Sequence, residues 1–261
     1  MCKNLSVAGD HCGLVFTKVG AAKQTVARAA GRRFVLTTAM PILLYGVTQS
    51  TETASVATGV GGAEVRSEEI AGLRIYWSEM PDAEMCLSSP ECARTSLSQF
   101  QKVLREILVL TTPIPFAFPT LLQDVDALQE RLTADREFYC ATLERVGNAV
   151  QYIITASWTT EEQADLATPV SGREYRKRRE ESMARMEAID KKLKNVTGNS
   201  VSEWRDRQDR RTHRWFALVP RECRESFLAT LRAAGPSEGV RLRLSGPWPP
   251  DEFIASPDAS R

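Results

Sequence analysis

Histidine is the usual side chain for acid–base or metal chemistry near neutral pH, and this sequence contains only two. His11 lies in a basic N-terminal segment. His213 stands among three arginines, Arg210, Arg211 and Arg214. Neighbouring positive charge disfavours protonation of an imidazole and discourages a bound cation. His213 is therefore the sole candidate for the base of a catalytic Ser or Cys, and an enzyme of that kind is the least favoured reading.

The cysteine and glycine patterns offer no metal site, cofactor cradle or exposed nucleophile. The six cysteines are too sparse for a disulfide framework and form no CxxC pair. No GxSxG turn exposes a serine, and neither GxGxxG nor GxxxxGK[ST] occurs. The sequence thus predicts reduced thiols in the cytoplasm, no cofactor, no metal and no enzymatic activity. The cysteines are Cys2, Cys12, Cys86, Cys92, Cys140 and Cys223.

Charged side chains gather in two stretches of the C-terminal half. Arg173–Lys194 contains nine positive and five negative side chains, and Arg205–Arg214 contains five and two. Such stripes can follow a phosphate backbone, but interleaved acids are more typical of a solvated surface. Asp124 and Asp126 lie near an expected helix start, where negative charge offsets the helix dipole. A nucleic-acid-binding module that uses the Arg-rich region 173–214 stays open as the alternative function.

Composition places the chain among ordinary globular proteins. It has 261 residues, of which 43% are hydrophobic and 26% charged, which excludes collagen-like and wholly disordered chains. No apolar run approaches the roughly 20 residues of a membrane-spanning helix. The net charge is +1, but residues 1–39 hold six basic and one acidic side chain. The remainder is mildly acidic, which argues against a protein that coats nucleic acid.

Residues 1–39 are predicted to be a disordered basic leader, because they lack helical or strand periodicity. Met40 immediately precedes a strand-like run, so one interpretation is a start codon assigned upstream of the true one. The other is a basic tail that docks on an anionic surface. Both interpretations stay open.

The elements from residue 40 to 119 predict an N-terminal ferredoxin-like domain. Apolar runs and period-two alternation indicate strands, and a stripe of apolar residues at helical spacing indicates one helix. Three prolines confine the last extended segment to a sheet edge or a strand end. The order strand, connection, strand, strand, helix, strand is that of a ferredoxin-like unit whose first helix is shortened or lost. The segments are Ile42–Val47, Ala63–Arg66, Leu73–Trp77, Ser96–Leu110 and Pro113–Pro119.

Residues 120–254 are predicted to form a C-terminal α+β domain with a long charged helix, followed by a tail at 255–261. Apolar spacing from Val125 predicts one helix of about seven turns. The charged helix that begins near Ser171 has a narrow apolar stripe, so we expect it to project from the body or lie across it. Strands are expected at Val150–Trp158, Trp215–Val219 and Val240–Leu244, with a short helix from Arg221.

The string Ser245-Gly246-Pro247-Trp248-Pro249-Pro250, preceded by a Leu-Arg-Leu strand and followed by Phe253, resembles the C-terminal signature of the gas vesicle protein GvpL/GvpF family. Further similarities follow in the family's order over Ile42–Ile254. They are Leu43–Val47, Pro115–Thr120, Ser171–Tyr175 and Leu218–Arg221. The chain departs from the family pattern at Ala117, Pro119 and Asp251, and is identified as a diverged member.

The resemblance implies two α+β domains and an accessory role in gas vesicle assembly, without catalysis. It also implies binding of the small hydrophobic shell protein GvpA, and of other accessory proteins, during nucleation or growth, in the cytoplasm and at the gas vesicle. A shell subunit that faces gas carries apolar surface that would aggregate in water. A chaperone-like partner must offer apolar or edge-strand surface to cover it.

Two apolar segments are the predicted protein interface. A proline-rich loop loses little entropy when it docks, and an exposed tryptophan is a typical interface anchor. The alternative, that Trp248 caps the sheet of its own domain, stays open. The candidate interface residues are Phe116, Phe118, Pro247, Trp248, Pro249, Pro250 and Phe253.

Overall fold

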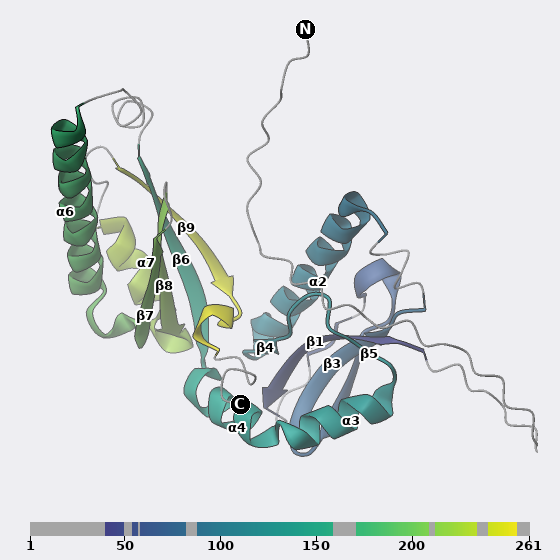
Figure 1. Ribbon diagram of the computed structural model, residues 1–261. Coiled ribbons are helices and arrows are strands. Elements are labelled where there is room, and N and C mark those ends of the chain that lie inside the picture. Colours follow the sequence, from purple (N-terminus) through teal and green to yellow (C-terminus); the bar gives the residue numbers. More distant parts are fainter. Residues whose placement is uncertain are drawn as a thin grey trace, which may run out of the picture. The chain divides into compact units, whose positions relative to one another are not determined.

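The computed structural model describes residues 40–49, 54–56, 58–81, 88–158, 171–208, 212–233 and 240–254. The predicted leader 1–39 and the tail 255–261 lie outside these residues. Two antiparallel sheets with helices form the fold (Figure 1). In the described ranges, no helix combines the length and the apolar character that crossing a bilayer requires.

The first sheet has the strand order β2-β3-β1-β4, with β5 also paired to β1. All its pairs are antiparallel. The two-residue turn Ala71-Gly72 has positive φ at both positions, as a tight hairpin requires, and joins β2 to β3. This is the order of the predicted split β-α-β unit, with a 3-10 turn at Val60–Gly62 in place of its first helix. The strands are β1 (Ile42–Gln49), β2 (Arg66–Ile70), β3 (Leu73–Glu79), β4 (Ile114–Pro115) and β5 (Leu121–Leu122).

Helices bury both faces of β1, which explains its continuous apolar run. Leu43 and Tyr45 pack in one core with α2 (Pro90–Leu110). Ile42, Leu44 and Val47 pack in the other core with α3 (Val125–Ala134) and α4 (Arg136–Val146).

Two helix predictions in this part of the chain are wrong. The seven-turn helix from Val125 is two helices, because Asp135 leaves helical geometry at φ −100° and ψ 13° and ends α3. The break lets both helices present apolar residues to the same core. Helix α2 starts before Ser96, since Ser89 accepts a hydrogen bond from the Cys92 amide at 3.1 Å and Pro90 occupies the first turn.

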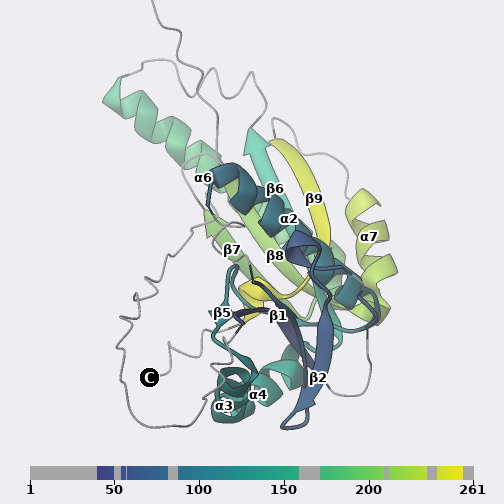
Figure 2. The ribbon, with the colours of Figure 1, turned by 90° about the vertical axis from the view of Figure 1, so that its right-hand side faces the viewer.

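The second sheet repeats the topology of the first. Its order is β7-β8-β6-β9, so the first and third strands of the unit are again central. Figure 2 shows the four strands side by side, with β9 at one edge. Helices α6 and α7 cover one face through a shared core. The elements are β6 (Ala149–Trp158), α6 (Gly172–Thr197), β7 (Glu203–Gln208), β8 (Thr212–Pro220), α7 (Arg224–Ala233) and β9 (Val240–Trp248), with 3-10 turns at Gly198–Ser200, Arg221–Cys223 and Asp251–Phe253.

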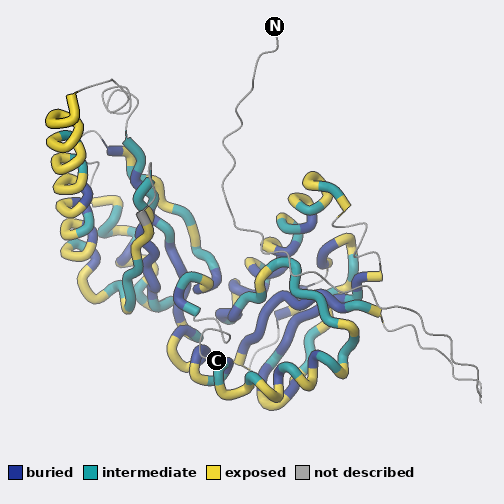
Figure 3. The backbone as a smooth tube through the Cα atoms, in the orientation of Figure 1, coloured by how far each residue is buried: buried dark blue, intermediate teal, exposed yellow. Residues whose placement is uncertain are grey.

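Helix α6 is buried only along its C-terminal half. Met186, Ile189 and Leu193 belong to the core of the second sheet, whereas Tyr175 and Met183 are exposed. Figure 3 shows this change along the helix. The predicted apolar stripe is therefore buried at Met186, Ile189 and Leu193, whereas Tyr175 and Met183, which the same spacing placed in it, are exposed.

The end of α2 is joined to the second sheet by direct contacts. Leu108 packs in the second core, and its carbonyl accepts a hydrogen bond from the Arg221 guanidinium at 2.7 Å. Thr112 Oγ1 donates to the Ala149 carbonyl at 2.8 Å. Helices α3 and α4, which follow residue 119, complete the core of the first sheet. The division into domains 40–119 and 120–254 stays a prediction.

Candidate protein-interaction site

Phe116 and Phe118 lie on opposite faces of the first sheet. Phe116 packs on the α3–α4 side, with its ring centroid 6.1 Å from that of Tyr139. Phe118 packs on the α2 side, 5.2 Å from the ring of Phe100. Both are half-buried. The two rings therefore do not form one apolar patch.

The segment that carries these rings is at the sheet edge, as its prolines predict. Only Ile114 and Pro115 pair with β1, and β4 ends the strand order. The Phe116 amide still donates to the Tyr45 carbonyl at 3.0 Å. The guanidinium of Arg131 lies 5.8 Å from the centroid of the Phe116 ring, so a cation covers part of that ring.

The loop that follows Trp248, the last residue of β9 (the Trp248 loop), is held by Gln151, a buried residue of the central strand β6. Gln151 Nε2 donates to Asp251 Oδ1 at 2.6 Å, and Gln151 Oε1 accepts from the Glu252 amide at 3.0 Å. Trp248 lies opposite Gln151 across the β6–β9 pair. Asp251, one of the departures from the family pattern, thus has a structural role in this chain.

The C-terminal signature is only partly accessible. Phe253 is fully buried, and Pro249 and Pro250 are buried as well. Arg205 lies over the Phe253 ring at 5.2 Å, and the Phe253 carbonyl accepts a hydrogen bond from Arg145. Pro247 and Trp248 are half-buried. Of the five predicted interface residues in this segment, only these two retain surface for a partner.

The backbone conformation and the close surroundings of position 246 explain why the C-terminal signature has a glycine there. The φ of Gly246 is +129°, a conformation that residues with a Cβ rarely adopt. A Cβ at this position would also lie 2.8 Å from the Gln151 carbonyl oxygen and 2.9 Å from Tyr152 Cδ1. The backbone of β9 therefore approaches β6 closely at Gly246, near the C-terminal end of the strand.

Two exposed apolar residues at the end of α2 were missed in the sequence analysis. Val109 is 74% exposed and Leu110 is 53% exposed. Both continue the apolar run Ile107-Leu108, so composition alone places them in the core. Helical periodicity is the signal that separates Val109, which falls off the stripe that Phe100, Leu104 and Ile107 define. Leu110 follows Ile107 by three residues, and it is exposed as the last residue of the helix.

His213, the candidate base, lies in an enclosed environment. The His213 side chain is only 12% exposed and stacks on Trp215. Burial lowers its pKa. Within the described ranges, no three or more His, Cys, Asp and Glu residues are grouped as metal ligands.

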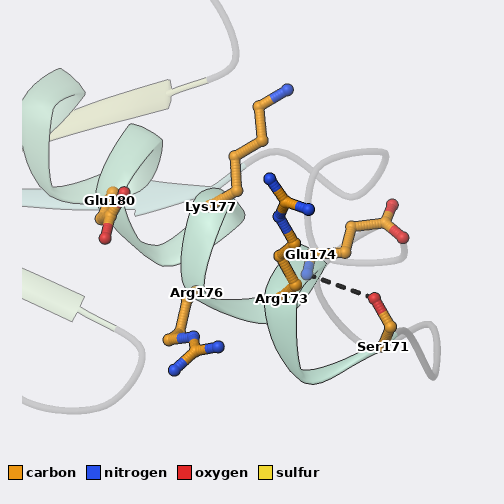
Figure 4. A pocket seen from close by; sticks show the side chains of 6 residues that line it. All are labelled: Ser171, Arg173, Glu174, Arg176, Lys177 and Glu180. Carbon is orange, nitrogen blue, oxygen red and sulfur yellow. Dashed lines mark hydrogen bonds between the residues drawn. The ribbon is translucent and has the colours of Figure 1, made fainter.

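The hollow at the start of α6 is formed by a single helix. Ser171 Oγ caps the helix by accepting from the Glu174 amide at 3.3 Å. Figure 4 shows that the lining side chains point in different directions rather than toward a common centre. We therefore assign no ligand to it. It is lined by Ser171, Arg173, Glu174, Arg176, Lys177 and Glu180.

The sequence matches a protein-family model, and the fold is similar to two crystal structures. The family model described as "Gas vesicle synthesis protein GvpL/GvpF" matches residues 41–255. The crystal structure of gas vesicle protein GvpF from Anabaena sp. PCC7120 has a TM-score of 0.68 and 17% identity, covering 83% of this chain and 99% of that chain. GvpF from Microcystis aeruginosa has a TM-score of 0.67 and 17% identity, covering 83% and 100%. No curated protein matches this sequence.

Proposed function

Because the chain belongs to the GvpL/GvpF family of gas vesicle synthesis proteins, we propose that it binds the hydrophobic shell protein GvpA during nucleation or growth of the vesicle. In this role it acts without catalysis, in the cytoplasm and at the gas vesicle, together with other accessory proteins. The observation that carries the proposal is the family match, which spans both sheets.

Two exposed apolar residues at the end of α2 support a contact with an apolar partner. Val109 and Leu110 present two adjacent aliphatic side chains to solvent at the end of α2. Exposed apolar surface on a folded protein commonly marks a site of interaction. In the proposed role, these side chains cover apolar surface of a shell subunit before it polymerises.

The predicted interface residues enter the proposal in two groups. Phe116, Phe118, Pro247 and Trp248 are half-buried and keep surface for a partner. Pro249, Pro250 and Phe253 are buried, so we assign them the role of holding the Trp248 loop in place. We further propose that each sheet with its helices forms one domain.

Co-purification of GvpA with this protein tests the proposal, using the double variant V109S/L110S. We expect the amount of GvpA recovered to fall about tenfold, because removing apolar contact worth roughly 1.4 kcal/mol changes an equilibrium constant by that factor. Exposed substitutions of this kind usually change stability by less than about 0.5 kcal/mol, so the fold is retained.

The matched control is Y175S/M183S, which removes two exposed apolar side chains of α6. It should leave GvpA recovery unchanged. Recovery that is equal in both double variants would reject the α2 surface. Normal vesicles after deletion of the gene, together with no co-purification of GvpA, would reject the function itself.

A further inference from the structure

Among the strands that the structure describes, β9 pairs with β6 only and so forms an edge of the second sheet. An edge strand presents unpaired backbone N–H and C=O groups that another strand can use. The opposite edge strand, β7, carries charged side chains that form ion pairs. Arg205 pairs with Glu203 at 3.0 Å, and Arg207 pairs with Glu252 at 2.8 Å. The edge of β9 lacks such pairs among the described residues.

Arginine and leucine alternate along β9 and point to opposite faces. Arg241 and Arg243 lie across from Ser157 and Thr155, on the face away from α6 and α7. Both are exposed.

The leucines of β9 lie on the face that the helices cover. Leu242 and Leu244 lie across from Ala156 and Ile154, two residues of the helix-covered core. Leu242 packs partly in that core, but Leu244 is 40% exposed. The free edge thus combines basic side chains on one face with apolar surface on the other.

The helix-free face of this sheet concentrates positive charge. Arg207 lies opposite Arg214, Arg214 lies opposite Thr155, and Thr155 lies opposite Arg243. Like charges directly across two strands destabilise a sheet. Arg207 is balanced by Glu252, but Arg214 and Arg243 have no carboxylate partner among the described residues. An anionic partner would relieve this repulsion.

We propose that β9 accepts a strand of a partner protein along its free edge, and that this segment alternates acidic and apolar residues. Side chains of an added strand also alternate between the two faces of the sheet. The acidic residues would then meet Arg241 and Arg243, while the apolar residues extend the surface of Leu242 and Leu244.

The added ladder ends before Pro247, because proline has no N–H to donate. The segment therefore pairs with Val240–Ser245. This partner chemistry differs from that of an apolar shell subunit, so the inference does not depend on the proposed function.

A protein strand fits this face better than a nucleic acid does. Proteins that bind single strands stack bases on exposed aromatic rings. The residues beside the arginines are Thr155 and Ser157, which are not aromatic. On the same face Phe216 is buried, and the half-buried Trp248 lies at the other end of β9, across from Gln151. The arginines supply charge without a stacking platform.

Fluorescence anisotropy of the full chain with a labelled synthetic peptide in which Glu and Val alternate tests the inference. We expect saturable binding that weakens with salt. A peptide of equal composition, with its Glu and Val residues in separate blocks, should bind about tenfold more weakly, since register is lost. The alternating peptide, N-methylated on the amides that face β9, should not bind, because it cannot form the ladder.

The variant R241E/R243E should weaken binding of the alternating peptide about tenfold or more, because two favourable cross-strand charge pairs become repulsive. R176E/R179E makes the same charge change on the exposed start of α6 and should leave binding unchanged. R241A/R243A removes the charges without reversing them. If its circular dichroism spectrum matches that of the parent chain, weaker peptide binding reflects the lost contacts and not a lost fold.

Three results would overturn the inference. They are equal binding of the N-methylated peptide, equal loss in the two charge-reversal variants, and binding of a single-stranded oligonucleotide but not of the alternating peptide. Recovery of GvpA in the co-purification experiment does not enter this test, so either proposal can fail while the other holds.

Discussion

The imidazole ring of His213 lies flat against the indole ring of Trp215, with centroids 4.2 Å apart and 22° between the ring planes. Neither imidazole nitrogen has a hydrogen-bond partner among the described residues. Asp206 Oδ2 lies 3.6 Å from Nε2. Burial lowers the pKa of His213, and the charges of Asp206 and Asp190 oppose that shift without cancelling it. The fold therefore favours the neutral imidazole.

This environment makes the stability of the protein dependent on pH. The unfolded histidine has a pKa of about 6.5, so the folded state binds fewer protons near and below that pH. The contribution of His213 to stability is complete above about pH 6.5 and is lost as the pH falls through the folded pKa. We expect the free energy of unfolding to decrease as the pH falls below about 6.5. Urea denaturation at a series of pH values measures this dependence of the free energy of unfolding on pH.

The variant H213F keeps an aromatic ring against Trp215 but does not titrate, and it should flatten this dependence. H11Q alters the other histidine of the chain and should keep the parent's slope. The same slope in H213F and the parent chain would contradict the assignment.

Asp190 connects α6 to the core of the second sheet. Trp215 Nε1 donates to Asp190 Oδ1 at 2.9 Å, and Lys194 Nζ lies 2.8 Å from Asp190 Oδ2. We expect D190A to lower the free energy of unfolding by about 1–3 kcal/mol, because it leaves the N–H of a buried tryptophan without a partner. D190N retains an acceptor and should cost less. Chemical denaturation followed by tryptophan fluorescence measures the free energy of unfolding of both variants. Equal losses of stability in D190A and D190N would argue against the hydrogen bond.

The hydroxyl of Tyr45 organises the segment before β2. It lies 2.9 Å from Ser78 Oγ and accepts from the Val60 amide at 3.0 Å, inside the α2 core. Y45F should lower the free energy of unfolding by about 1–3 kcal/mol, since the Val60 N–H loses its partner. Y175F removes a hydroxyl from an exposed ring and should be neutral. Thermal denaturation of both variants measures the difference. Equal melting temperatures of Y45F and Y175F would contradict the prediction.

Gly246 should tolerate no side chain. We expect G246A to cost about 1–3 kcal/mol from backbone strain at positive φ, with the clash against the Gln151 carbonyl in addition. G172A, at the start of α6, is the control, because a Cβ there meets no atom within 4 Å. Denaturant midpoints of the two variants measure the difference in stability. A G246A chain as stable as G172A would contradict the positive φ and the close approach to β6 at position 246.

Local patterns in the sequence predicted several elements correctly. Leu73, Ile75 and Trp77 share one core, as their period-two spacing indicates. The apolar run of β1 and the C-terminal half of the α6 stripe also have the burial that their patterns imply. The family inferred from the C-terminal signature is confirmed by the match over residues 41–255. These features are readable because each depends on neighbours within a few residues.

Other elements could not be predicted because their patterns are weak or their geometry is set by distant partners. Strand β7 was missed, since Glu203–Gln208 is mostly polar and lies at a sheet edge. The chain breaks into two helices at Asp135, and both α3 and α4 pack on the core of the first sheet. The spacing of apolar residues along the sequence does not reveal this break. The rings of Phe116 and Phe118 look adjacent in sequence but contact opposite faces of a sheet.

The sequence by itself determined the family, the alternation along β9 and the identity of the residues in the Trp248 loop. Tertiary structure alone decided which of them face solvent. Phe253 is fully buried because Gln151, a residue about a hundred positions earlier, holds the loop, and β9 is open because it has one neighbour. Burial and strand register arise from contacts between segments far apart in the chain, and a linear pattern does not contain those contacts.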